Sequence, residues 1–459
     1  MSSLKRPDGT ANARFRLPPA GGTRLLPAPP QERSPAWLLA VYAVIFGTLI
    51  FNLGLAFINT RVMGISQNHV VLSELLLTAC ALLLAMTRRA NLYVVIGLYL
   101  AYMLMIMALR GVIDPKSVRD ALVPVIFYFM GRQIHDIRQV DRLVLWSALL
   151  VIAVGLIEYF FLDLFLQNIN IFDYYVARGT ITADSNFLGE DSPLFHSGVR
   201  LGGRNFFAFL GSHRVSSVFL EPVSMGNFGA FLVMWAVFRQ DMQGRLLLFA
   251  LAFAVIILGD ARFGMFVSLS FFLIAPLNRI TPRAVLVAAP ILIVLLLIIY
   301  AAASNRLGWD DTLTGRWLYS GQLLMKLDWK GILGISNMQT YLSDSGYAFA
   351  LFQTGAIGLL GLWVLYIYAP AASDAGWRFK VLIAVYICLL MIVSYSLSTI
   401  KTGGLLWLCA GAADAWNGRH PAGASRLVLP SLFRRRRPER PAVTGRWKLP
   451  PGFEKGRRA

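Results

Sequence analysis

Long apolar segments alternate with short polar ones along most of the chain. Segments such as 37–57 and 284–302 reach the ~20 consecutive apolar residues that an α-helix needs to cross the hydrocarbon core of a bilayer. We therefore predict an all-α polytopic integral membrane protein with about twelve transmembrane helices. The expected helices cover residues 37–57, 69–87, 91–109, 118–131, 143–166, 213–238, 246–259, 263–277, 284–302, 346–372, 380–398 and 403–417.

These segments define a helical domain, 37–417, between two terminal tails, 1–36 and 418–459. The connections on one side of the predicted membrane are short, so a nucleotide-binding domain does not fit there. The other side carries two long connections, 167–212 and 303–345, and long loops commonly carry function. Two interpretations of the first loop stay open: a folded lid or sugar-binding surface, and an ordinary solvated loop.

Charge gives the orientation of these helices. The formal net charge is +19 at pH 7, and most Lys and Arg residues fall on the side that holds both termini. By the positive-inside rule we expect both termini to be cytoplasmic. The basic, Pro-rich N-terminal tail is predicted to be disordered. The C-terminal tail, which contains RRRRPER, is interpreted as binding anionic lipid headgroups rather than nucleic acid.

The predicted span 213–238 carries charged side chains into an otherwise apolar segment. On a continuous helix Arg214, Ser217, Glu221 and Ser224 would share one face, because they follow steps of three, four and three. Pro222 would then break the helix beside a site. The alternative is an ion pair at a helix end. Charged groups inside a membrane are costly, which favours a functional role.

Arginines recur at the predicted external boundary of the membrane: Arg214, Arg262 and Arg316. Guanidinium groups that converge form an anion site, since their planar donors match phosphate oxygens and hold a diphosphate without a metal. Each could also be an interfacial side chain with no ligand. The histidines lack metal-ligand spacing, so we expect metal-independent chemistry and no cofactor. Glu74 and Glu158 are interpreted as carboxylates satisfied by packing partners.

Four motifs in order, RVSSVFLEP, GDARFGMF, TLTGRWLYSG and DSGYAFALFQTGAIGLLG, carry a resemblance to a known family. Together they resemble the bacterial polysaccharide polymerase and O-antigen ligase superfamily across most of residues 205–365. The resemblance implies a GT-C-like membrane fold in the bacterial inner membrane. It also implies that Arg214, Arg262 and Arg316 contact the diphosphate of an undecaprenyl-linked glycan. Asp344 departs from the family pattern, which often has His there in a ligase.

The expected activity is a polymerase that joins undecaprenyl-diphosphate-linked oligosaccharide units into an exopolysaccharide, capsule or O-antigen at the periplasmic face. An O-antigen ligase, which transfers finished polymer to an acceptor, and a lipid-oligosaccharide flippase are the alternatives. A flippase and a chain-length regulator are possible partners. The acceptor hydroxyl needs a base, and Glu221 is favoured over Asp344 and His213. His213, Ser217 and Trp317 are candidate acceptor or sugar contacts.

Overall fold

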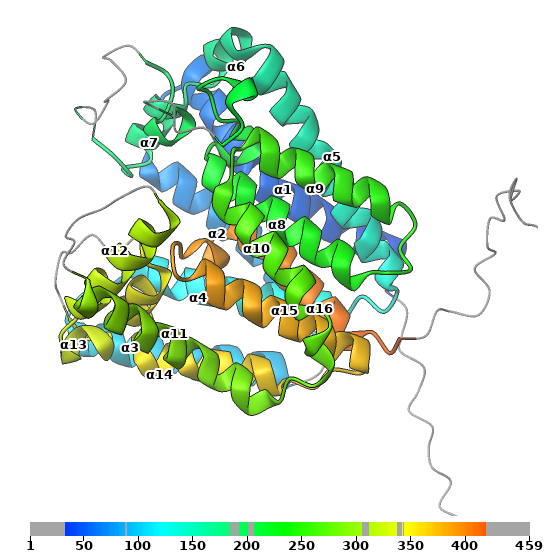
Figure 1. The fold of residues 1–459 in the computed structure, drawn as a ribbon, viewed down its shortest axis with the longest axis vertical. Coiled ribbons are helices and arrows are strands. Elements are labelled where there is room, and N and C mark those ends of the chain that lie inside the picture. Colours follow the sequence, from blue (N-terminus) through cyan, green and yellow to red (C-terminus); the bar gives the residue numbers. More distant parts are fainter. Residues whose placement is uncertain are drawn as a thin grey trace, which may run out of the picture. The chain divides into compact units, whose positions relative to one another are not determined.

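The computed structural model describes residues 33–87, 90–182, 184, 192–200, 206–304, 312–336, 342 and 344–418. Apart from one isolated bridge between Val199 and His213, the regular structure of these residues is helical (Figure 1). The α-helices are α1 (Pro35–Arg61), α2 (Gln67–Ala85), α3 (Asn91–Arg110), α4 (Pro115–Gly131), α5 (Ile137–Phe160), α6 (Leu162–Asn168), α7 (Ile171–Ala177), α8 (Pro222–Phe238), α9 (Arg245–Leu258), α10 (Arg262–Ile274), α11 (Arg283–Ala303), α12 (Leu313–Met325), α13 (Trp329–Ile332), α14 (Gly346–Tyr368), α15 (Asp374–Leu390) and α16 (Ile400–Ala415).

The prediction of a helical membrane protein is confirmed. Within the described ranges, 6 helices are long and apolar enough to cross a bilayer, namely α1, α2, α3, α5, α11 and α14. The helices α8, α9 and α10 are apolar but shorter. Each of the twelve predicted segments overlaps a helix. The number of helices that cross the membrane stays a prediction, because the shorter ones do not reach the length of a full span.

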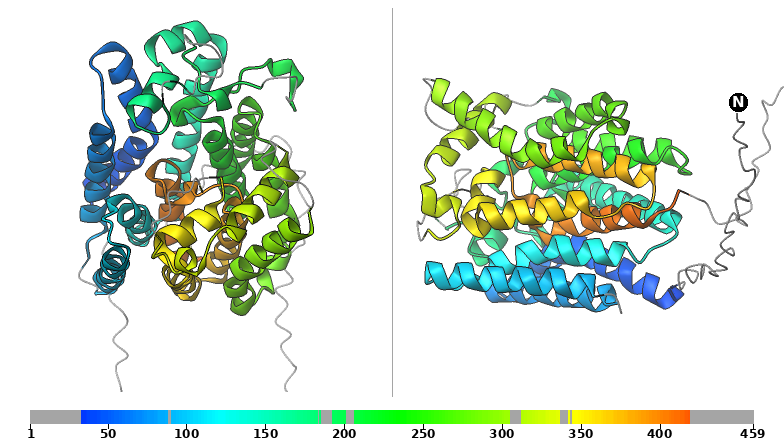
Figure 2. Two further views of the ribbon diagram at one scale, coloured as in Figure 1. Left: turned by 90° about the vertical axis from the view of Figure 1, so that its left-hand side faces the viewer. Right: turned by 90° about the horizontal axis from the view of Figure 1, so that it is seen from below.

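Helices α8 and α16 form the centre of the helical unit, and nearly all of their residues are buried. Helix α16 packs on α4, α15 and α1, while α8 packs on α9, α10 and α15. In the right-hand view of Figure 2, the orange α16 lies between the cyan α4 and the green helices α8 to α10. The amino-terminal helices therefore line one side of the centre, and the middle of the chain lines the other.

Glycines let α4 and α16 approach each other at backbone distance. A Cβ atom added to Gly411 would lie 1.9 Å from the carbonyl oxygen of Tyr128, and one added to Gly131 would lie 2.0 Å from that of Leu408. Small residues at helix interfaces are the usual means of close packing in membranes, where apolar contacts with lipid compete with those between helices. This contact fixes α16, and with it the polar residues at its two ends.

Buried ion pairs form a layer at one end of the central helices. Asp141 of α5 pairs with Arg239, the residue that follows α8, at 2.9 Å, and Lys380 of α15 pairs with Asp414 of α16 at 2.9 Å. A rise of about 1.5 Å per residue places Glu158, near the other end of α5, about 25 Å from Asp141. This separation is close to the ~30 Å thickness of a hydrocarbon core, so the charged layers belong near the two membrane boundaries.

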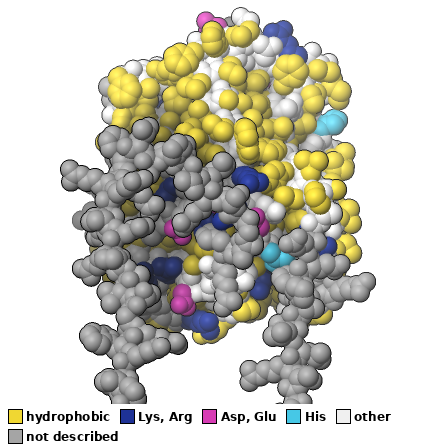
Figure 3. Space-filling view, turned by 90° about the vertical axis from the view of Figure 1, so that its right-hand side faces the viewer, with side chains coloured by type: hydrophobic (Ala, Val, Ile, Leu, Met, Phe, Trp, Pro, Cys, Tyr) yellow, Lys and Arg dark blue, Asp and Glu magenta, His cyan; other side chains and the backbone are white. Residues whose placement is uncertain are grey.

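The surface fits this arrangement. On the face drawn in Figure 3, hydrophobic side chains cover large areas, and Lys and Arg side chains gather among a few acidic ones and His. Exposed Leu, Ile and Phe side chains occur along α2, α3, α10 and α11. A water-soluble protein rarely exposes apolar area on this scale, whereas a lipid-facing surface requires it.

The predicted continuous helix over 213–238 is wrong, because α8 begins at Pro222. Proline suits the first helical position, and it favours extended backbone at the residue before it, which is the conformation of Glu221. Ser217 and Leu220 have φ values of 51° and 57°, so the segment before Pro222 turns sharply. Pro222 therefore starts a helix rather than breaking one, and the four polar residues do not share a helical face.

Other boundaries also differ from the expectation. The predicted span 143–166 ends earlier, since α5 stops at Phe160 and α6 follows separately. The predicted long loops 167–212 and 303–345 contain helices: α7 in the first, α12 and α13 in the second. Most of the predicted tails, 1–36 and 418–459, lies outside the described residues.

Candidate functional site

The carboxylate of Glu158, near the end of α5, organises the segment that precedes α8. It is fully buried and accepts hydrogen bonds from the backbone nitrogens of Ser216 (2.9 Å) and Ser217 (2.5 Å) and from the Ser216 hydroxyl (2.9 Å). Nε2 of His213 lies 3.1 Å from Oε1 of Glu158. These partners satisfy a carboxylate that would otherwise be very costly to bury. The sharp turn before Pro222 is therefore built around Glu158.

Two predicted sugar contacts belong to this turn. The hydroxyl of Ser217 is fully buried and donates to the carbonyl of Val151 at 2.6 Å. His213 faces Glu158, and its Nδ1 is buried without a hydrogen-bond partner among the described residues. In this structure both side chains hold the segment in place, and Ser217 offers no surface to a glycan.

Arg214 lies next to this turn and is 6% exposed. Its guanidinium donates to the backbone carbonyls of Ser197 (Nη1, 2.9 Å), Gly259 (Nε, 3.1 Å) and Asp260 (Nη2, 3.4 Å). Three carbonyls from two separate segments are thus held by one side chain. This geometry gives Arg214 a positioning role between the first long loop and the α9–α10 turn, where the sequence suggested a contact to phosphate.

The α9–α10 turn is itself stabilised by a carboxylate. Asp260 has a φ of 42°, pairs with Arg200 at 3.2 Å, and accepts hydrogen bonds from the backbone nitrogens of Phe206 (3.1 Å) and Phe207 (3.3 Å). Arg262 is the first residue of α10 and is half-buried. The structure places it at the same end of the helices as Arg214.

Glu221, at the N-terminus of α8, forms an ion pair that the sequence analysis missed. Its Oε2 lies 3.1 Å from Nζ of Lys401, the second residue of α16, and 2.7 Å from the hydroxyl of Ser224. Lys401 is 8% exposed, whereas the side chain of Glu221 is 35% exposed. Both hydrogen bonds that the Glu221 side chain makes to the described residues fall on Oε2, which leaves Oε1 for a ligand.

In the sequence, the only feature that marks Lys401 is its position between two predicted spans, 380–398 and 403–417. A lone Lys at such a boundary resembles an interfacial side chain. Only the contact between α16 and α8 brings it to Glu221, across 180 positions of sequence.

Asp344 and Arg316 come from the second long loop and lie in the same polar region. The hydroxyls of Ser320 on α12 and Ser345 before α14 are 2.6 Å apart, which fixes the start of α14 against α12. Burial raises the pKa of Asp344 above its usual value, while the charges of Arg316 and His196 lower it and that of Glu221 raises it. Residues from both long loops thus interact electrostatically with Glu221.

Trp317, the neighbour of Arg316, packs edge-on against Phe266 of α10 with ring centroids 5.9 Å apart. Its Nε1 is buried and has no hydrogen-bond partner among the described residues. The ring therefore connects α12 to α10. Its indole N–H is left to donate a hydrogen bond to a ligand.

A second group of ion pairs extends the polar region into α2 and α4. Glu74 of α2 pairs with Arg119 of α4 and lies 3.8 Å from Arg178, while Arg119 pairs with Asp120 at 2.6 Å. Arg178 also acts electrostatically on Glu221. We call the combined set the outer polar layer: Glu74, Arg119, Asp120, Arg178, His196, Glu221, Arg316, Asp344 and Lys401.

In Figure 1, α7, which ends next to Arg178, and α12, which carries Arg316, both lie towards the left-hand side of the view. The layer combines carboxylates with cations, and Glu221, His196 and Arg316 are accessible rather than fully buried. Such a set can take up a proton and stabilise an anion. Within the described ranges, no group of three or more His, Cys, Asp and Glu is placed to hold a metal ion.

Comparisons of the chain with protein-family models, with curated proteins and with solved structures found no match.

Proposed function

We propose that this chain is a membrane glycosyltransferase that polymerises oligosaccharide units carried on a polyprenyl diphosphate. The observation that supports it is the ion pair between Glu221 and Lys401 at 3.1 Å, at one end of a helical membrane unit, together with Asp344, which interacts electrostatically with both Glu221 and Arg316. Transfer of a sugar from a diphosphate needs both kinds of group. A carboxylate removes the proton of the attacking hydroxyl, and cations stabilise the departing diphosphate.

In the proposed step, a hydroxyl oxygen of the acceptor sugar attacks the anomeric carbon of the donor. The new carbon–oxygen bond forms as the bond between that carbon and the diphosphate oxygen breaks. The electron pair leaves with the diphosphate, and the hydroxyl proton passes to a carboxylate. Oε1 of Glu221 is the favoured acceptor of this proton, because Oε2 is fixed by Lys401 and Ser224.

The leaving diphosphate gains negative charge as the bond breaks, so cations fixed in place beforehand stabilise the transition state more than the ground state. Arg316 is half-buried and close enough to Asp344 to lower its pKa. We assign the contact with the diphosphate to Arg316 and leave Arg262 as a second candidate. Arg214 acts through the backbone segments that it holds.

Purified protein in detergent tests the proposal, with lipid-linked repeat units as the only substrate. A polymerase lengthens the glycan on the lipid, whereas a flippase leaves its length unchanged. A ligase needs a different acceptor, so it does not extend the repeat units on their own. Unchanged glycan length with well-folded protein would overturn the proposal.

Arg316→Gln should lower the rate of polymer formation by about 100-fold, the usual scale for removing one group that stabilises a transition state. Arg279→Gln is the matched control, because Arg279 is exposed and lies beyond the other end of α10. Equal losses in the two variants would show that the effect comes from net charge and not from the site.

A further inference from the structure

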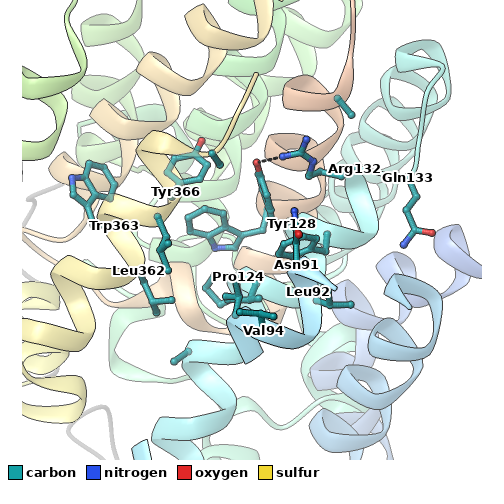
Figure 4. Close-up of a pocket in the computed structure, with 18 of the residues that line it drawn as sticks. Asn91, Leu92, Val94, Pro124, Tyr128, Arg132, Gln133, Leu362, Trp363 and Tyr366 are labelled. Carbon is teal, nitrogen blue, oxygen red and sulfur yellow. Dashed lines mark hydrogen bonds between the residues drawn. The ribbon is translucent and has the colours of Figure 1, made fainter. Parts of the chain in front are cut away.

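A large cavity lies apart from the outer polar layer. Its volume is about 1650 Å³, and it is bounded by α3, α4 and α14, by the ends of α1 and α2, and by parts of α15 and α16. Figure 4 shows Leu362 and Trp363 of α14 on one side of it and Val94 of α3 and Pro124 of α4 on another. None of the residues that line it belongs to the outer polar layer.

Most of the lining side chains are apolar, and they follow the helices from Thr354 and Ser398 to the far end at Arg132. Val94, at 53% exposed, opens the α3 wall to the surroundings. A cavity of this kind between membrane helices suits hydrocarbon chains, because the bilayer supplies no water to fill it.

Positive charge is concentrated at one end. Arg33, Arg132 and His135 line this end together with Gln133, and the described lining residues include no Asp or Glu. Arg33 donates to Gln133, and Arg132 donates to the hydroxyl of Tyr128 at 3.2 Å. The dashed line in Figure 4 marks the bond of Arg132. Guanidinium donors held this way at the mouth of an apolar cavity match a phosphate with acyl chains attached.

The other end of the cavity carries hydroxyl groups but no charge. Thr354, Tyr395 and Ser398 line it, and the Thr354 hydroxyl is already bonded to the carbonyl of Ala350 at 2.9 Å. An anionic headgroup is therefore stabilised only at the arginine end. Tyr93, Tyr368 and Trp37 lie near that end, as expected for the interfacial region of a membrane.

We propose that this cavity binds an anionic glycerophospholipid of the surrounding bilayer. The phosphate lies between Arg33 and Arg132, and the acyl chains extend between α3 and α14. The arginine end of the cavity lies at the end of α16 that carries the Asp414 ion pair, and the Asp141 ion pair lies at the corresponding end of α5. The headgroup therefore sits at the membrane boundary opposite Glu221. The site is thus distinct from the one proposed for the glycan donor.

Lipid retention measured by native mass spectrometry tests the site. The full chain is purified and exchanged into detergent with phosphatidylglycerol or phosphatidylethanolamine of identical acyl chains. We expect one phosphatidylglycerol to remain bound at detergent concentrations that remove phosphatidylethanolamine. Arg132→Gln and Arg33→Gln should each weaken retention by about tenfold, as expected for loss of one hydrogen bond to a charged group. Arg142→Gln is the charge-matched control on the exposed surface of α5.

A second pair of variants tests the apolar part. Leu362→Trp fills the cavity and should lower retention of phosphatidylglycerol, whereas Ile357→Trp, on the same helix but 67% exposed and outside the lining, should not. Equal retention of both lipids, or equal behaviour of each variant and its control, would overturn the site. Recovery of a polyprenyl phosphate in place of the glycerophospholipid would overturn the assignment of the occupant.

Discussion

The ion pair between Glu221 and Lys401 allows a test in which stability and activity separate. Glu221→Gln leaves the Lys401 ammonium buried, with the Phe219 carbonyl at 3.4 Å as its remaining recorded partner among the described residues. The positive charge of Arg178 also acts on Lys401 and is then no longer offset by the Glu221 carboxylate. Loss of one partner from a buried ion pair lowers the free energy of unfolding by about 3–5 kcal/mol. The glutamine carbonyl can still accept a hydrogen bond from Lys401, so we expect a loss near the lower value.

Lys401→Met should cost less. The carboxylate that remains is 35% exposed, so water replaces part of the lost interaction, and it keeps the Ser224 hydroxyl at 2.7 Å. Methionine fills the volume of the lysine stem. We expect a loss of about 1–2 kcal/mol in the free energy of unfolding. The double variant has no unpaired charge, so its stability should lie within about 1 kcal/mol of the wild type.

The assay is reversible unfolding in mixed micelles, followed for the wild type, both single variants and the double variant. A coupling energy of about 2 kcal/mol or more, with Glu221→Gln the less stable single variant, is the expected result. Additive effects, or a more damaging Lys401→Met, would refute the assignment of Lys401 as the buried partner. Polymer formation is then measured on the double variant. Lys401→Met is measured beside it: an active Lys401→Met with an inactive, stable double variant assigns the proton to Glu221, whereas an active double variant removes Glu221 from the reaction.

Three further outcomes are expected. Arg316→Gln removes the charge that lowers the pKa of Asp344 most, so the pKa of Asp344 should rise. If Asp344 must be ionised for the reaction, the acidic limb of the rate–pH profile then moves to higher pH. An unmoved limb excludes Asp344 as the base. Gly411→Leu should destabilise the protein by about 1–3 kcal/mol through overpacking, whereas Gly361→Leu, with open space at its Cβ, should unfold like the wild type. Arg214→Gln should lower the unfolding midpoint, and Arg214→Lys should restore little of it, because one ammonium does not reach three carbonyls.

The helical membrane fold could be predicted because it depends on a property of each segment alone. Apolar length and the cost of exposing backbone to lipid decide it, and this is why each predicted span overlaps a helix. Boundaries that depend on partners far along the chain could not be predicted. The segment before Pro222 turns because the Glu158 carboxylate accepts hydrogen bonds from the backbone N–H groups of Ser216 and Ser217. No local sequence pattern shows that these groups bond to a distant side chain instead of within a helix.

The same distinction applies to the candidate site. Charges in an apolar context mark Glu221, Arg316 and Asp344 as unusual, and the structure brings them into one polar layer. The guanidinium of Arg214 has the same appearance in the sequence, yet it holds backbone carbonyls. Carbonyl partners carry no signature in the sequence, since every residue has one. A sequence therefore identifies which side chains are costly to bury but not what satisfies them.

The surroundings of Glu221 and Asp344 also determine how each could serve as a base. Glu221 is oriented by two donors on one oxygen, which fixes the other oxygen for proton transfer. Asp344 has a raised pKa and so a higher affinity for a proton, and Arg316 next to it is the group that a departing diphosphate would attract. When the diphosphate binds Arg316, it neutralises part of the positive charge that lowers the pKa of Asp344. The affinity of the Asp344 carboxylate for a proton then rises further. Substrate binding would then raise the proton affinity of Asp344, whereas the fold orients Glu221 and, against the effect of burial, Lys401 and Ser224 lower its pKa. The double variant and the shift of the pH profile measure this difference.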